Sequence, residues 1–107
     1  MFCDLGVPTA AAIAYAKARG FKVVGSGGLR TGLDCARALA LGADLTGMAL
    51  PWLKTAFSEG YDAALGFGET TIQARKDACL LTGSKDIAAL QEAPKMLGPN
   101  LQRWSAF

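Results

Sequence analysis

A glycine-rich stretch at residues 23–32 provides the clearest chemistry in this sequence, and it reads "VVGSGGLRTG". Glycine lets backbone N–H groups approach a ligand closely, and successive N–H groups in a turn can bind an anion. The helix expected to follow adds unpaired N–H donors and the positive end of its dipole. Arg30 could add a bidentate phosphate contact. The spacing predicts a phosphate-binding loop, while glycines after a strand are also typical of a simple tight turn.

Groups suited to acid–base catalysis are scarce. The sequence contains no histidine, which is the commonest general base and metal ligand near neutral pH. Proton transfer would therefore need a carboxylate, a lysine such as Lys85, one of the tyrosines Tyr15 and Tyr61, or a cofactor. We expect Asp34 to cap a helix rather than act as an acid. No catalytic residue is predicted.

Three cysteines, Cys3, Cys35 and Cys79, are widely spaced and odd in number. They fit neither a metal-binding spacing nor a disulfide framework, so no metal site is predicted and a reducing cytoplasm is expected. Cys35 and Cys79 fall within helical patterns, where we expect structural thiols.

Composition indicates a folded chain of one modest domain's size. The chain has 107 residues, of which 51% are apolar and 19% charged. A net charge of +2 gives no indication of binding to nucleic acid or to an anionic membrane. The sequence shows no signal-peptide pattern and no apolar window of roughly 18 residues, so we expect neither secretion nor membrane insertion.

The elements that must position the loop form a strand–helix–strand unit. Thr31 and Asp34 resemble a capping box at the start of its helix. Such a unit predicts two parallel strands joined by a right-handed crossover. The predicted order is a helix at 9–19, a strand at 21–26, a helix at 30–42 and a strand at 43–50.

Helical patterns dominate the rest of the chain. We predict helices over 51–60, 61–83 and 84–93, the second weakened by Gly66 and Gly68, and an irregular tail or short turn after them. Two parallel strands alone leave one sheet face and both edges open, whereas parallel sheets are normally covered on both faces. The fold class is therefore α/β, and the pattern favours part of a larger sheet.

Two known types of phosphate site compete for the glycine loop. A dinucleotide-binding fingerprint fits poorly, because Arg30 occupies its third glycine position and Asp44 lies at the start of the next strand rather than at its end. A (β/α)8-barrel phosphate site uses the loops after two adjacent strands. The second strand here ends in "GMALP", which leaves the N–H groups of Ala49 and Leu50 as further donors. The alternatives to a binding role are purely structural: an exposed surface position for Arg30 and a core position for Trp52.

Three segments resemble the C-terminal part of type 2 isopentenyl-diphosphate delta-isomerase. They are "GVPTAAAIAYA", "VVGSGGLRTGLDCARALALGADLTGMALPWLK" and "ACLLTGSKDIAAL". That family is FMN-dependent and folds as a TIM barrel. The resemblance implies that residues 1–107 are a single, incomplete segment of such a barrel: strands seven and eight with their helices and a C-terminal helical extension. Leu5 departs from the tryptophan that many relatives carry before "GxPTA", a difference that concerns local packing.

The resemblance also implies which residues bind the FMN phosphate. Leu29, Ala49 and Leu50 would use backbone N–H groups, because their side chains cannot bond a phosphate. The full set is Gly28, Leu29, Arg30, Ala49 and Leu50, flanked by Ser26 and Gly27.

The family is considerably longer than this chain, and its contacts to substrate diphosphate, magnesium and the flavin ring lie upstream. The resemblance implies a cytoplasmic homo-oligomer that uses FMN, Mg²⁺ and NADPH to convert isopentenyl diphosphate to dimethylallyl diphosphate in isoprenoid biosynthesis. In that parent reaction reduced FMN is the acid–base element. This chain alone is expected to be inactive. Two alternatives stay open: a segment of another FMN barrel oxidoreductase, of the α-hydroxy-acid oxidase or glutamate synthase type, and a non-catalytic small α/β protein.

Overall fold

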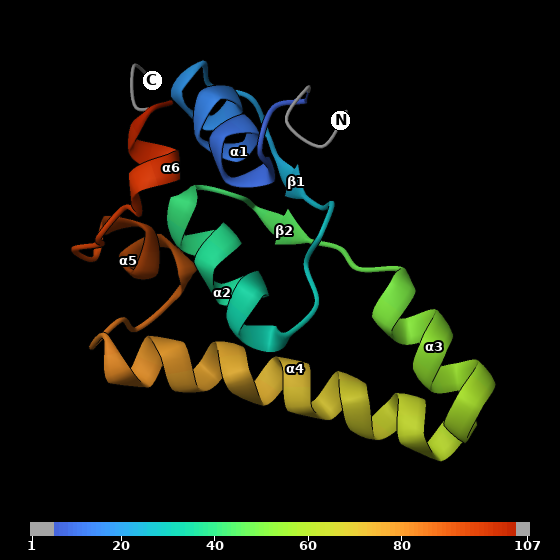
Figure 1. Ribbon diagram of the computed structural model, residues 1–107. Helices are drawn as coiled ribbons and strands as arrows, with labels where there is room; N and C mark the ends of the chain where they lie inside the picture. Colours follow the sequence, from blue (N-terminus) through green and yellow to red (C-terminus); the bar gives the residue numbers. More distant parts are fainter. Residues whose placement is uncertain (1–5, 105–107) are drawn as a thin grey trace.

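The computed structural model describes residues 6–104 as an α/β arrangement of short strands and mostly longer helices (Figure 1). The α/β prediction is confirmed. The predictions for Cys3 and Leu5 concern residues outside the described range. In chain order the elements are α1 (Thr9–Ala18), β1 (Val24–Gly25), α2 (Gly32–Leu41), β2 (Leu45–Thr46), α3 (Leu50–Glu59), α4 (Tyr61–Leu81), α5 (Ile87–Glu92) and α6 (Pro99–Gln102).

The two strands are parallel, as predicted, and they pair in register with Val24 opposite Leu45 and Gly25 opposite Thr46. The predicted strand lengths are wrong, because each strand has only two residues. A segment forms a strand only where a neighbouring strand pairs with its backbone N–H and C=O groups. Within residues 6–104, each strand has the other as its one neighbour. Backbone hydrogen bonds from Asp44 to Val23 and from Gly47 to Gly25 extend the contact to the adjacent residues, and the predicted strands reach no further.

Helices α1 and α2 cover one face of this sheet. A Cβ atom on Gly25 would lie 3.0 Å from Ile13 Cδ1 and 3.4 Å from Ala38 Cβ, so the strand backbone sits directly against both helices. The same helices contribute most of the buried residues, including Leu39, which is 5% exposed. Small side chains on α1 and α2 permit this close approach, and they form the core that holds the loop after β1.

The opposite face of the sheet is apolar and uncovered by the described residues. Val24 and Leu45 are paired across the strands, and each is 65% exposed. Side chains alternate between faces along a strand, which explains why the neighbouring Val23 is buried while Val24 is not. An uncovered apolar face is unusual for a parallel sheet.

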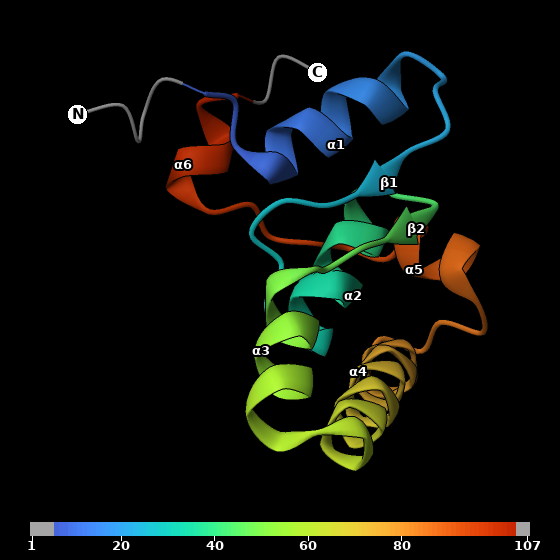
Figure 2. The same ribbon diagram turned by 90° about the vertical axis from the view of Figure 1, so that its right-hand side faces the viewer.

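Helix α3 leads away from the sheet, and α4 returns beside it and packs against α2 (Figures 1 and 2). The Trp52 and Phe67 rings meet edge to face, with centroids 5.1 Å apart. Gly68 leaves room for this indole, since a Cβ there would lie 2.6 Å from it. Trp52 therefore packs between helices, although its side chain is still 37% exposed.

The long helix predicted over 61–83 is confirmed, and the predicted tail contains the single-turn helix α6.

Asp44 joins the start of β2 to the chain before β1. Its Oδ2 atom accepts a hydrogen bond from the Val23 N–H at 2.8 Å, and its own N–H donates to the Val23 carbonyl at 2.8 Å. The Val23 hydrogen bond holds the pKa of this carboxyl below its ordinary value, and Lys17 and Lys22 act in the same direction. A carboxyl whose pKa is lower in the folded state stabilises the fold while it is ionised.

We expect the stability of the chain to fall once pH drops below the ordinary aspartate pKa of about 4, because the unfolded chain is then protonated first and protonation of folded Asp44 weakens this link. Asp44→Asn keeps an oxygen acceptor but cannot titrate, so its melting temperature should lose less between pH 6 and pH 3 than that of the unsubstituted chain. Thermal unfolding followed by circular dichroism at both pH values measures the difference. Parallel losses in the two proteins would contradict the assignment to Asp44.

Candidate functional site

The loop after β1 depends on two consecutive glycines. Gly27 has φ +94° and Gly28 has φ +81°, a region that residues with a Cβ atom rarely adopt. Other residue types at these two positions would strain the backbone. The glycines singled out in the sequence are therefore needed for the conformation of the loop itself.

Helix α2 begins with the predicted cap. Thr31 Oγ1 accepts a hydrogen bond from the Asp34 N–H at 3.2 Å, and the Asp34 carboxylate reaches back toward the loop. It accepts from the N–H of Arg30 at 3.0 Å, one residue before the position that a capping box would predict. Asp34 also forms an ion pair with Arg37 at 3.6 Å. Asp34 thus has the structural role expected of it.

This cap limits which hydrogen-bond donors of Arg30 are available to an anion. Its backbone N–H is engaged by Asp34, and its Nη1 donates to the Leu29 carbonyl at 3.2 Å. The Arg30 residue is exposed, and its guanidinium keeps further donors. The predicted contact from Arg30 must therefore come from the side chain.

Backbone donors remain at the two preceding residues. Within residues 6–104, neither Gly28 nor Leu29 donates its N–H group to a protein acceptor. The Leu29 side chain is buried in the core, so only its backbone can meet a ligand. A Cβ atom on Gly28 would have no neighbour within 4 Å, so this residue borders open space. Two adjacent free N–H groups beside a helix N-terminus suit an anion.

The loop after β2 starts next to the loop after β1. The Gly47 N–H donates to the Gly25 carbonyl at 2.8 Å, and Ser26 Oγ lies 3.9 Å from where a Gly47 Cβ would be. Helix α3 then begins at Leu50, with Ala49 as a cap residue that supplies no side-chain hydrogen bond. Among residues 6–104, no side chain accepts a hydrogen bond from the first N–H groups of α3. No hydrogen bond between described residues links Ala49 or Leu50 to the glycine loop.

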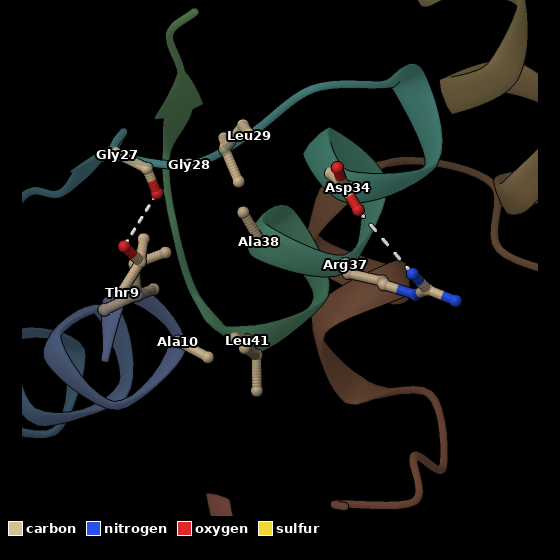
Figure 3. A pocket seen from close by; sticks show the side chains of 10 residues that line it. Thr9, Ala10, Gly27, Gly28, Leu29, Asp34, Arg37, Ala38 and Leu41 are labelled. Atoms are coloured by element: carbon tan, nitrogen blue, oxygen red, sulfur yellow. Dashed lines mark hydrogen bonds and ion pairs between the residues drawn. The ribbon is translucent and has the colours of Figure 1, made fainter. Parts of the chain in front are cut away.

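A hollow of about 220 Å³ lies behind the glycine loop, between α1 and α2 (Figure 3). Its walls are mainly apolar, with a threonine and an ion pair at the edge. Thr9 Oγ1 donates a hydrogen bond to the Gly27 carbonyl at 2.7 Å, which ties α1 to the loop. Sequence reasoning missed this residue; its only local signal is its place after Pro8 at a helix start. The lining includes Thr9, Gly27, Gly28, Leu29, Asp34 and Arg37.

The remaining candidate groups are the cysteines and the acidic side chains of the described residues. Cys35 is buried, as expected, and Cys79 is partly buried; both are free thiols. Residues 6–104 contain no group of three or more histidine, cysteine, aspartate or glutamate side chains that could hold a metal ion. Over the same range, every helix is too short or too polar to cross a bilayer.

Comparisons with known proteins match this chain over most of its length. The model of the FMN-dependent dehydrogenase family matches residues 6–96. Curated proteins named isopentenyl-diphosphate delta-isomerase are 42% identical in Sulfurisphaera tokodaii, 44% in Pyrobaculum islandicum and 37% in Methanopyrus kandleri, each over 106 residues. These alignments cover 96–97% of this chain but only 28–29% of each relative. The chain thus spans less than a third of the length of the relatives it matches.

Proposed function

This chain belongs to the FMN-dependent dehydrogenase family, and from that premise we propose that it forms the FMN-phosphate-binding, C-terminal segment of an isopentenyl-diphosphate delta-isomerase. The names of the relatives support the isomerase, and identities of 37–44% over nearly the whole chain support a shared site. The small share of each relative that is matched supports a segment, residues 1–107, rather than a complete catalytic domain.

The observation that carries this proposal is the pair of N–H groups on Gly28 and Leu29, which have no acceptor within the described residues. They would bind the phosphate of FMN together with the Arg30 guanidinium. Ala49 and Leu50 would add backbone donors from the start of α3, with Ser26 and Gly27 flanking the first group. The donor set fits a phosphate because it is neutral or positive and projects from two adjacent loops. When bound, reduced FMN would supply the acid–base chemistry of the isomerisation.

The uncovered sheet face supports placing this segment in a (β/α)8 barrel, as strands seven and eight. Val24 and Leu45 would then face the barrel interior, and neighbouring strands would pair with the two open edges. The rest of the parent protein would bind the diphosphate substrate, Mg²⁺, NADPH and the flavin ring. We propose that this parent is a cytoplasmic homo-oligomer and that this chain alone has no turnover.

One observation favours a second candidate. The matching family model is described as a dehydrogenase, so the parent could be an FMN-dependent oxidoreductase that uses the same phosphate loop. The names of the relatives favour the isomerase. In both cases the role of this segment is to anchor FMN by its phosphate.

The proposal is tested by titrating the ¹⁵N-labelled chain with FMN, riboflavin and inorganic phosphate. We expect the amide signals of Gly28 and Leu29 to shift with FMN and phosphate but not with riboflavin, which lacks the phosphate. A dissociation constant of about 1 mM, or about −4 kcal/mol, is expected because the flavin-ring contacts are not in this chain. Chemical shifts of the backbone amides give the affinity residue by residue.

Gly60 and Gly83 provide internal controls for this titration. Both have positive φ, but their N–H groups already donate to Ala56 and Leu80. Their signals should not move with any of the three ligands. Equal shifts with FMN and riboflavin would contradict phosphate anchoring. Isomerase turnover by this chain with reduced FMN and Mg²⁺ would contradict the view that the site is incomplete.

A further inference from the structure

Thr9 makes a long-range contact that bears directly on the glycine loop. Its hydroxyl donates to the Gly27 carbonyl at 2.7 Å, across 18 positions of sequence (Figure 3). Thr9 is the first residue of α1, and it is partly buried. A Cβ atom on Gly27 would lie 3.2 Å from this hydroxyl oxygen, so the close fit uses the absence of a side chain there.

Because the peptide unit is planar, this contact also sets the direction of the next N–H group. The Gly27 carbonyl and the Gly28 N–H belong to one trans peptide unit, in which C=O and N–H point in opposite directions. Because Thr9 binds the carbonyl on the side of α1, the Gly28 N–H points away from α1. This is one of the two donors assigned to the phosphate.

Sterics do little to hold this peptide in place. It joins two glycines, and a Cβ on Gly28 would meet no atom within 4 Å. The rest of the loop is held by other means: the Leu29 side chain is buried in the core, and Asp34 binds the Arg30 N–H. The unit between Gly27 and Gly28 therefore depends on Thr9 for its orientation.

We propose that Thr9 is a positioning residue for phosphate binding, which keeps the Gly28 N–H directed outward. This inference rests on the proposed function. Without the hydroxyl, the peptide can rotate and present the Gly27 carbonyl oxygen to the ligand, which replaces a donor by a repelling acceptor. Thr9 does not itself touch the phosphate; it acts through the peptide it holds.

The test compares hydroxyl-free and hydroxyl-bearing variants of Thr9 in the full chain. Thr9→Val keeps the shape of the side chain and Thr9→Ala favours the helix, but both remove the donor; Thr9→Ser keeps it. We expect both hydroxyl-free variants to weaken inorganic phosphate and FMN binding by about fivefold, the effect of one hydrogen bond, while the serine variant stays close to the unsubstituted chain. The Gly28 amide shift reports affinity, and the carbonyl ¹³C shift of Gly27 in the ligand-free chain reports the hydrogen bond from Thr9 that sets the peptide orientation.

Thr82→Val is the matched control, because Thr82 Oγ1 also donates to a backbone carbonyl, that of Ala78 at 2.8 Å, at the far end of α4. It should leave phosphate affinity unchanged. Unchanged affinity in Thr9→Val and Thr9→Ala, or an equal loss in Thr9→Ser, would overturn the positioning role. If the Gly28 signal of the unsubstituted chain does not shift with phosphate, the proposed function and this inference fail together. If it shifts, but the Thr9 variants bind phosphate equally well, only this inference fails.

Discussion

Leu39→Ala is expected to lower the free energy of unfolding by about 2–5 kcal/mol, the usual cost of emptying a buried leucine site. Leu39 lies on α2, is 5% exposed and belongs to the core cluster beside the sheet. Since single domains are stable by only about 5–15 kcal/mol, this loss would unfold a large share of the molecules under mild denaturant. Urea unfolding followed by circular dichroism measures it.

Leu33→Ala is the matched control, because Leu33 is on the same helix but is 49% exposed. It should cost much less than Leu39→Ala. Similar losses at the two positions would mean that the core beside the sheet does not hold this chain together. The result matters for function, since α2 starts directly after the glycine loop and positions its cap.

Gly32→Ala is expected to destabilise the chain by about 1–3 kcal/mol through overpacking between helices. A Cβ atom at this first residue of α2 would lie 2.5 Å from Ala74 Cβ and 2.9 Å from the Thr71 carbonyl oxygen of α4. Backbone atoms cannot turn aside as a flexible side chain can, so the two helices must separate. Urea midpoints of the purified variant give the change.

Gly66→Ala serves as the opposite case on the same pair of helices. Gly66 lies inside α4, and a Cβ there would meet no atom within 4 Å. Alanine should therefore raise the free energy of unfolding, by about 0.5–1 kcal/mol, because it is the better helix former. A stabilising Gly32→Ala, or an equal effect at both sites, would show that α4 does not pack against α2 as described.

Local patterns in the sequence were enough to find most elements. The helix starting at Gly32 follows from the cap formed by Thr31 and Asp34, which are three residues apart. The parallel pair follows from two apolar segments with a helix between them. The strand lengths were predicted too long, because pairing depends on neighbouring strands rather than on the apolar residues within a segment.

The candidate site also combines features that the sequence shows with features that only the structure shows. Its glycines, its following helix starts and its basic residue are local features, so the sequence alone predicted a phosphate-binding loop, with a simple tight turn as the alternative. The engagement of the Arg30 N–H by Asp34 refines that prediction, because it leaves only the Arg30 side chain as a donor. Assignment of the phosphate to FMN came from resemblance, and the family match now supports it.

The sequence by itself determined that helices flank two parallel strands, and it predicted which loop can approach an anion, because these follow from interactions among residues a few positions apart. Only the tertiary structure decided which way the loop presents its N–H groups. That orientation depends on Thr9 reaching the Gly27 carbonyl across 18 positions. The structure also decided that Val24 and Leu45 share a face that the described residues leave open. Contacts between distant segments arise from packing, and no local pattern of residue types specifies them.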